Sequence, residues 1–187
     1  MRNLIMWNVI TLDGCFEGEK PWDLSFHELV WGKELEDFGN EQLASADMLV
    51  FGKNTYVGMA DYWSKAEGGP EGATARNMNA IKKIVCSATL ERAEWNNTTI
   101  VRDAVADIRA LKQAGDRNML VFGSGALSES LMNANLFDEY RLVIAPVILG
   151  KGRRLFTAGL ARQKLKLLEE RTLASGGVMV SYAPITQ

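Results

Sequence analysis

The sequence predicts an α/β fold with a largely parallel sheet, and three observations support this prediction. Short runs of branched and aromatic residues, typical of buried strands, alternate with segments of helical spacing as far as residue 145. The last third of the chain changes to strand-like segments separated by a pair of glycines. The length of 187 residues suits one domain, which we expect to span residues 1–187.

The first half is expected to begin with a buried strand at Leu4–Ile10. Ser25 followed by Glu28 is a capping-box pattern, which predicts that a helix starts there. Apolar residues keep helical spacing beyond it, and Gly32 and Gly39 leave open whether the region forms one long helix or two short ones. The next expected elements are a strand at 48–51, a helix from 53, a glycine–proline loop at 68–70, a helix near 73–80 and a strand at 83–86.

The second half repeats the alternation once and then changes character. Gly176 and Gly177 separate the last two expected strands, so these are predicted to form an antiparallel hairpin. The expected elements are a strand at 99–101, a helix at 104–114, a strand at 118–122, a helix at 126–133, a strand at 139–145, a loop at 150–154 and strands near 164–171 and 178–184.

Composition excludes several classes of function. With 21 basic and 23 acidic residues the net charge is -2, so no overall field attracts nucleic acid or a membrane surface. Cys15, Cys86 and the single His27 are too few ligands for a structural zinc site, and we expect no metal and reduced thiols. The segment 4–12 is a poor signal peptide, and no run approaches the roughly 20 apolar residues of a membrane span. We therefore expect a cytoplasmic protein that does not enter the membrane.

Two junctions, Val50–Thr55 and Val121–Ala126, pass from a strand through glycine directly into a helix. A helix start attracts acidic residues to its first turn, yet the first acids here are Asp61 and Glu129. Lys53 even places a cation in such a turn, where it opposes the helix dipole. Both helix starts are therefore candidate anion sites. An equally good explanation of each is structural: the glycines allow a tight turn, and Lys53 is a solvated surface residue.

Side chains at these junctions suit a bound phosphate. Thr55 can donate a hydroxyl hydrogen, and Gly123 and Gly125 allow close approach of the backbone to a pyrophosphate. Together the two sites would hold both ends of a phosphorylated dinucleotide. The second junction lacks the third glycine of the dinucleotide-binding fingerprint and lies late in the chain, so a standard Rossmann fold is disfavoured.

An ordered set of motifs carries a family resemblance that spans essentially the whole chain. The motifs are Thr11–Gly14, Phe51–Tyr56, Phe122–Gly125, Phe137–Arg141 and Ala145–Gly152. In this order they resemble the dihydrofolate reductase superfamily, and more closely the reductase half of the bifunctional riboflavin-biosynthesis deaminase/reductase and its stand-alone bacterial relatives.

The resemblance implies a three-layer fold with a mixed, mostly parallel eight-stranded sheet, a homodimer and NADPH as the hydride donor. It would place the adenosine 2′-phosphate near Lys53 and Thr55, where lysine keeps the charge of the more usual arginine but loses its bidentate geometry. The implied cofactor-binding residues are Gly52, Lys53, Thr55, Ser87, Thr89, Gly123, Ser124, Gly125, Ala126 and Leu127.

The expected function is reduction of a small heterocyclic or imine substrate by NADPH, similar to that of 5-amino-6-(5-phosphoribosylamino)uracil reductase in riboflavin biosynthesis. Dihydrofolate reductase activity and a non-catalytic nucleotide-binding role are the alternatives. The arginine-rich segment that would hold a ribose phosphate is missing before the second predicted strand. Lys151, Arg153 and Arg154 either substitute for it or form an exposed basic turn.

Hydride transfer depends mainly on positioning and exclusion of water. Asp13 is the candidate polar group near the reacting centre, or else a turn former. Trp22, in a stretch that resembles the nicotinamide-covering loop of dihydrofolate reductases, is expected to gate the site, and Trp7, Met59 and Ala145 are expected to line it. Two ways of counting to the carboxylate of those enzymes disagree, because one reaches His27 or Glu28 and the other reaches Glu36.

Overall fold

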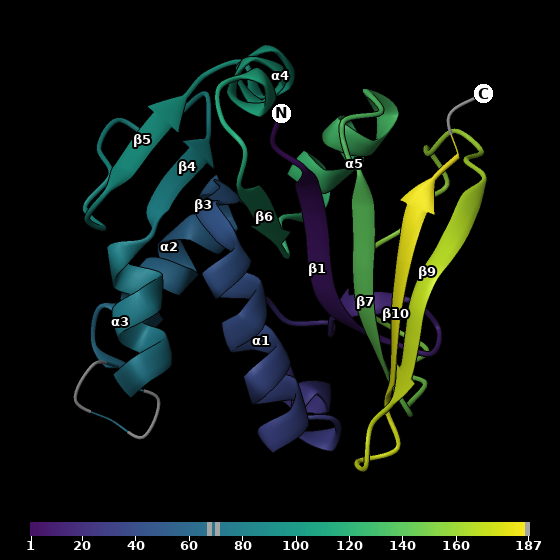
Figure 1. Cartoon of the computed structure of the whole chain (residues 1–187). Coiled ribbons are helices and arrows are strands. Elements are labelled where there is room, and N and C mark those ends of the chain that lie inside the picture. The colour runs from purple at the N-terminus through teal and green to yellow at the C-terminus, as the bar shows by residue number, and fades with distance from the viewer. Residues whose placement is uncertain (67–68, 70–71, 186–187) are drawn as a thin grey trace.

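The computed structural model describes residues 1–66, 69 and 72–185, which form a central sheet between two layers of helices (Figure 1). The sheet has eight strands in the order β5-β4-β3-β6-β1-β7-β10-β9. Neighbours pair in parallel except for β10, which is antiparallel to both β7 and β9. These findings confirm the predicted mixed, mostly parallel sheet and its antiparallel C-terminal hairpin.

The strands of the main sheet lie close to their expected positions, and three of them match residue for residue. Their bounds are β1 (Leu4–Thr11), β3 (Ala46–Gly52), β4 (Lys82–Cys86), β5 (Thr98–Val101), β6 (Asn118–Phe122), β7 (Glu139–Ala145), β9 (Leu165–Thr172) and β10 (Val178–Pro184). A separate two-stranded sheet pairs β2 (Cys15–Glu17) with β8 (Arg153–Arg154). Neither strand of this small sheet was expected, and Arg153–Arg154 lies where a loop was predicted.

The helices divide between the two faces of the sheet. The 3-10 helix η1 (Ser25–Leu29) and the helices α1 (Lys33–Ser45), α2 (Lys53–Trp63) and α3 (Gly72–Ala80) pack on one face, and α4 (Ala104–Gln113) and α5 (Gly125–Asn133) pack on the other. None of the helices in the described ranges is long and apolar enough to cross a lipid bilayer.

Alternation of side chains along each strand separates the core into two layers. Leu4 and Met6 of β1 join the cluster under α4 and α5, whereas Ile5 packs with residues of α1, α2 and α3 on the opposite face. Val9 continues that second face under η1 and α1. The period of two in a strand thus buries both faces of the central strands, which explains their nearly continuous apolar sequences.

A helix begins at Ser25 as expected, but it is the 3-10 helix η1 and the predicted capping box does not form. The structure also decides between one long helix and two short ones. No side chain caps η1, and the Ser25 hydroxyl donates to Asp23 Oδ1 at 2.8 Å instead of reaching along a helix. The region forms two short helices that separate at Gly32, whereas Gly39 lies inside α1. The expected loop at 68–70 falls mostly outside the described residues, since only residue 69 of it is described.

The hairpin between β9 and β10 turns through the expected glycines. Gly176 has a φ of 91°, a conformation that favours glycine, and its N–H donates to the Leu173 carbonyl at 2.9 Å. The Leu173 N–H in turn donates to the Gly177 carbonyl at 2.8 Å. The paired glycines therefore act as the sequence predicted.

Candidate functional site

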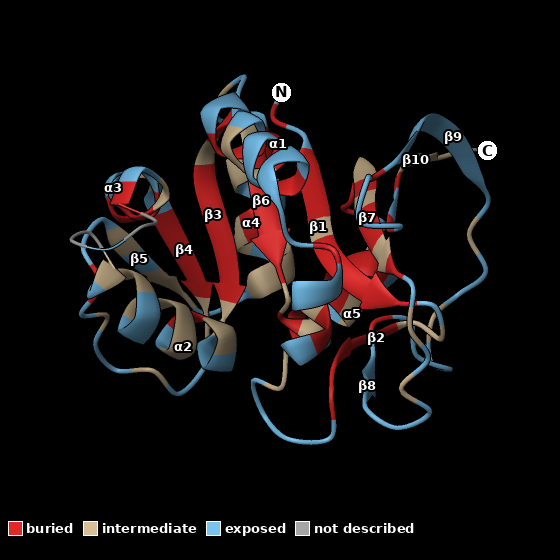
Figure 2. Cartoon of the chain, turned by 90° about the horizontal axis from the view of Figure 1, so that it is seen from below, coloured by how far each residue is buried: buried red, intermediate tan, exposed pale blue. Residues whose placement is uncertain are grey.

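A large cleft of about 1180 Å³ opens where β3, β4 and β6 end, beside residues 7–9 of β1. In parallel sheets flanked by helices, ligands bind outside the carboxyl ends of the strands, so this is the place where a site is expected. Figure 2 shows α2, α5 and the β2–β8 pair gathered at this end of the sheet. The cleft has two chemically distinct sides, which we call the anion side and the aromatic side.

The anion side is formed by the first turns of α2 and α5 together with the chain that follows β4 and β5. At α2 the N-cap is Gly52, no side chain caps the helix, and the first turn contains no acid. Lys53, the first residue of α2, lines the cleft, and its Nζ donates to Thr89 Oγ1 at 3.0 Å. The first backbone N–H groups of α2 therefore lack a side-chain acceptor.

The start of α5 repeats this arrangement on the neighbouring strand. Its N-cap is Ser124, whose φ of 56° follows a Gly123 φ of 53°, and again no side-chain cap and no acid is present in the first turn. Two left-handed residues in succession turn β6 sharply into the helix. The amides of Gly125, Ala126 and Leu127 occupy the first turn, and all three residues line the cleft.

Hydrogen bonds join the two helix starts to each other. The Ser124 N–H donates to Thr55 Oγ1 at 3.0 Å, and the Gly52 N–H donates to Ser124 Oγ at 3.0 Å. The Gly123 N–H donates to Asn8 Oδ1 at 2.7 Å. The amides of Gly123 and Ser124 are thus already occupied, and only the later amides of the α5 turn are available to a ligand.

A third segment completes the anion side after β4 and β5. Ser87 lines the cleft, and its hydroxyl oxygen accepts from the N–H groups of Thr89 and Leu90. Arg102, which follows β5, donates to the Ser87 carbonyl at 2.6 Å and also lines the cleft. Arg102 was not predicted, although its place directly after an expected parallel strand was a usable signal.

The aromatic side lies between β1 and the layer that contains η1, α1, α2 and α3. It is formed by Trp7, His27, Trp31, Glu36, Gly39, Asn40, Met59, Asp61, Trp63, Thr74 and Met78. Trp7 is held by an edge contact with Phe122 at 5.1 Å between ring centroids. Trp7 and Met59, both expected from the sequence, line the cleft. Of the positions reached by the two counts to a carboxylate, His27 and Glu36 line it and Glu28 does not, whereas the contribution of α3 was not expected.

Ala145 and Thr89 lie elsewhere. Ala145 is fully buried in the core beneath η1 and does not reach the cleft, so the structure corrects its expected place in the substrate site. Thr89 does not line the cleft itself, but it accepts the hydrogen bond from Lys53. Its connection to a bound anion would be indirect.

Trp22 reaches across the cleft to α2. An ideal Cβ on Gly58 would lie 2.0 Å from Cζ2 of the Trp22 indole, so the ring rests directly on this glycine. Trp22 has a φ of 64°, which is rare for a bulky residue, and its N–H donates to Glu17 Oε1 at 2.8 Å. The loop thus holds Trp22 at the cleft in a backbone conformation that is strained for a bulky residue. Its gating role stays a prediction.

Glu17 also orders the neighbouring strand pair. It is buried, and its Oε2 accepts from Arg153 at 2.8 Å. The Arg153 guanidinium lies over the Phe16 ring, 5.4 Å from the centroid, and beside Gly125 at the start of α5. Of the three basic residues considered from the sequence, Arg153 is the one that lines the cleft.

Asp13 lies outside the cleft, contrary to the position expected for a catalytic residue. Its carboxylate accepts from Thr11 Oγ1 at 2.6 Å and from the N–H groups of Leu149 and Gly150 at 3.2 and 2.9 Å. The Thr11 hydroxyl, aided by these two amides, lowers the pKa of Asp13 to about 2. A carboxylate so occupied is a poor proton donor, so the geometry supports a role in holding the 149–150 loop.

Burial perturbs two other groups that line the cleft. Desolvation lowers the pKa of His27 to about 4, so its imidazole is neutral near pH 7, and its Nε2 has no hydrogen-bond partner in the described structure. Burial raises the pKa of Cys86 to about 12, which makes its thiol unreactive. Among the described residues, no cluster of three or more His, Cys, Asp or Glu side chains is arranged to hold a metal.

Comparison with known proteins identifies related sequences along nearly the whole chain. Residues 2–179 match the family model described as the RibD C-terminal domain. The uncharacterized protein YyaP of Bacillus subtilis (strain 168) is 29% identical over 183 residues, which are 97% of this chain and 94% of YyaP.

Solved structures share the fold at lower sequence identity. A proposed riboflavin biosynthesis protein from Shewanella sp. PV-4 superposes with a TM-score of 0.80 at 20% identity, covering 98% of this chain and 99% of that one. The diaminohydroxyphosphoribosylaminopyrimidine deaminase/5-amino-6-(5-phosphoribosylamino)uracil reductase of Thermotoga maritima gives a TM-score of 0.67 at 14% identity, with 98% of this chain covering 57% of that protein. At these identities both comparisons show a shared fold only.

Proposed function

The chain belongs to the RibD C-terminal domain family, and on that premise we propose that it is an oxidoreductase that uses NADPH to reduce a small heterocyclic or imine substrate. The reaction would resemble that of the uracil reductase named for the Thermotoga maritima relative. One observation carries the proposal: two uncapped helix starts, without acids in their first turns, meet at adjacent strand ends and share hydrogen bonds.

The residues of the anion side fit a phosphorylated dinucleotide. The first-turn amides of α5 suit a pyrophosphate, because backbone N–H groups and the positive helix end favour negative charge. Lys53 and Arg102 border the other end of the anion side and supply positive charge for a 2′-phosphate, with Ser87 between them. Asn8 holds the Gly123 amide and so keeps the turn in place.

The remaining residues would position the acceptor and exclude water. When bound, NADPH would supply a hydride, which carries two electrons, to an electrophilic carbon of the acceptor, and a proton from solvent would complete the reduction. Trp22 covers the cleft from the loop side, and Trp7 supports the acceptor from the strand side. Rate enhancement would then come mainly from holding the reacting atoms together.

Two measurements on the purified protein test the proposal. NADPH at about 100 times its Kd should stabilise the folded state by about 2.7 kcal/mol, which is measured as a rise in Tm. Loss of NADPH absorbance with 5-amino-6-(5-phosphoribosylamino)uracil, its dephosphorylated form or dihydrofolate should then show turnover. If the protein binds NADPH but oxidises it with none of the three compounds, the non-catalytic nucleotide-binding alternative is favoured. A Tm that neither NADPH nor NADH changes would contradict the proposal that the protein binds this cofactor.

A further inference from the structure

Resting on the proposed reductase function, we infer that the acceptor is a flat aromatic heterocycle that carries no phosphate group. The inference concerns the aromatic side of the cleft. It rests on the kind of surface that this side offers and on the sign of the charges that line it.

The walls of the aromatic side suit a flat ring. Trp7, Trp31 and Trp63 line it together with Met59, whose sulfur accepts from Trp63 Nε1 at 3.3 Å. Indole faces and a thioether bind aromatic rings through stacking and edge contacts. His27 adds a neutral ring, because its low pKa leaves it uncharged near pH 7.

The charged side chains on this side of the cleft are acidic. Glu36 lines the cleft from the first turn of α1 and is exposed to solvent. Its carboxylate makes no hydrogen bond or ion pair among the described residues, although the charge of Lys33 interacts with it. Asp61 of α2 also lines the cleft, where it pairs with Lys65. Lys33 forms its ion pair with Asp37 and not with Glu36, so the Glu36 carboxylate is only partly compensated. Such a carboxylate repels a phosphate dianion and attracts N–H donors of a heterocycle, so the site discriminates against phosphate.

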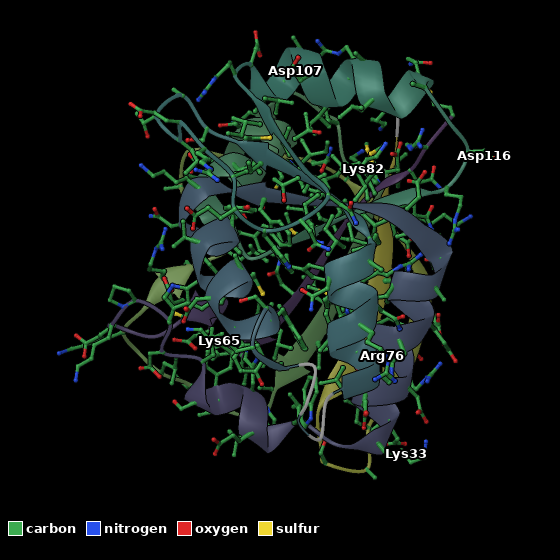
Figure 3. The ribbon with its side chains drawn as sticks, turned by 90° about the vertical axis from the view of Figure 1, so that its left-hand side faces the viewer. Lys33, Lys65, Arg76, Lys82, Asp107 and Asp116 are labelled. Carbon is green, nitrogen blue, oxygen red and sulfur yellow. The ribbon has the colours of Figure 1, made fainter. Side chains whose placement is uncertain are left out.

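The basic residues of the helices around the aromatic side do not cancel its negative charge. Figure 3 shows Arg76 and Lys33 on one side of the view and Lys65 on the other. Lys33 pairs with Asp37 and Lys65 with Asp61, and none of the three cations lines the cleft. A ribose phosphate in the aromatic side would thus meet carboxylate and indole surfaces.

Arg153 is the basic residue that comes nearest to offering an alternative. Its guanidinium is paired with the buried carboxylate of Glu17 and lies beside the first turn of α5. That place belongs to the anion side, where the pyrophosphate is proposed to bind. The positive charge of Arg153 would therefore lie beside the bound cofactor and not beside the acceptor.

The test compares one heterocycle with and without its phosphate. The probes are 5-amino-6-(5-phosphoribosylamino)uracil and the same compound after enzymatic removal of the phosphate, each titrated into protein saturated with NADP⁺. Quenching of tryptophan fluorescence reports binding, because three indoles line this side. We expect the dephosphorylated compound to bind roughly threefold to tenfold more tightly, as a single like-charge contact near the surface predicts. Tighter binding of the phosphorylated compound, or binding of neither, would overturn the inference.

Charge reversal at Glu36 provides the matched variant. Glu36→Lys should shift the affinity ratio toward the phosphorylated compound by at least about fivefold, and Glu36→Gln should shift it less in the same direction. Glu41→Lys, an exposed substitution on α1 away from the cleft, is the control and should leave the ratio unchanged. Equal ratios in all variants would overturn the inference. Preferential binding without NADPH oxidation would leave it standing and contradict the proposed reductase instead.

Discussion

Lys53 stands in the first turn of α2, where its positive charge opposes the helix dipole and no acid compensates it. Its hydrogen bond to Thr89 accounts for the orientation of the side chain but does not neutralise the charge. A bound phosphate would do so. Lysine donates through a single ammonium group, so a moderate preference for the phosphorylated cofactor is expected.

Replacement of Lys53 by alanine tests this assignment. Lys53→Ala should weaken NADPH binding by roughly tenfold to a hundredfold, because a hydrogen bond to a charged group contributes about 1.5–3 kcal/mol. NADH binding should change little. Isothermal titration with both cofactors measures the difference, and Lys82→Ala, at the opposite end of β4 from Ser87, is the control. Equal losses for NADPH and NADH would remove the role of Lys53 in recognising the 2′-phosphate.

His27, which lines the cleft, should make the stability of the folded protein depend on pH. Burial lowers its pKa from 6.5 to about 4 in the folded protein. Above pH 6.5 both states are neutral and the residue has no effect. As the pH falls from 6.5 to about 4, the unfolded chain binds a proton that the folded protein does not, so this group removes roughly 3 kcal/mol of stability.

The variant His27→Gln should therefore lose less stability on acidification than the parent protein. Urea unfolding at pH 7 and pH 4.5 measures the change in free energy for both proteins, and the difference between the two changes isolates the histidine. Identical changes in the two proteins would show that His27 titrates normally in the folded state.

At the scale of elements, the contact between the Trp22 loop and α2 has a measurable consequence. Glycine inside a helix normally costs about 0.5–1 kcal/mol relative to alanine. At Gly58 a Cβ would overlap the Trp22 indole, whereas at Gly39 of α1 the nearest atom to such a Cβ is 3.7 Å away. The two helical glycines should thus respond in opposite ways to the same substitution.

We expect Gly39→Ala to stabilise the protein by about 0.5–1 kcal/mol and Gly58→Ala to destabilise it or displace Trp22. In a Trp22→Ala background Gly58→Ala should become stabilising, because the obstacle is gone. Chemical unfolding of the four proteins in this double-mutant cycle measures the coupling between the two residues. A coupling free energy near zero would show that the ring does not rest on Gly58 in solution.

Exposure of β9 concerns the whole molecule, because this strand forms one edge of the sheet. All eight of its residues are exposed, and they include Leu165, Leu167 and Leu168 (Figure 2). An exposed apolar edge strand invites pairing with another chain. If β9 pairs antiparallel with a second copy about a two-fold axis between Leu167 and Leu168, Lys166 faces Glu169 of that copy, so this register pairs opposite charges. We propose a homodimer formed through β9.

Sedimentation equilibrium tests the dimer. The parent protein should sediment with twice the mass of the chain, and Leu168→Lys should give monomers, because two lysines would meet near the dimer axis. Leu12→Lys, at another exposed leucine outside the main sheet, is the control and should remain dimeric. A monomeric parent protein would contradict the proposal, as would a dimer that Leu168→Lys leaves intact.

Much of the fold was accessible from local sequence patterns. The bounds of β6, β7 and β10 come from short apolar runs with clear polar or glycine boundaries, and these patterns depend only on neighbouring residues. A helix begins at Ser25 as predicted, but the capping box does not form, because the Ser25 hydroxyl donates to the Asp23 carboxylate and the segment is a short 3-10 helix. The small β2–β8 sheet was missed because two or three residues carry too little pattern.

The candidate site divides in the same way. The sequence by itself determined the strand-to-helix junctions, the missing acids in their first turns and the place of Lys53, since these features lie within a few residues of one another. Tertiary structure alone decided that β3 and β6 are neighbours and that Ser124 bonds to Thr55. It also decided among the carboxylates that the sequence left open, because Glu36 lines the cleft and Asp13 and Glu28 do not. The reason is physical: a helix start is a local property of the backbone, whereas a cleft is made by side chains that only the order of the strands and the packing of the helices bring together.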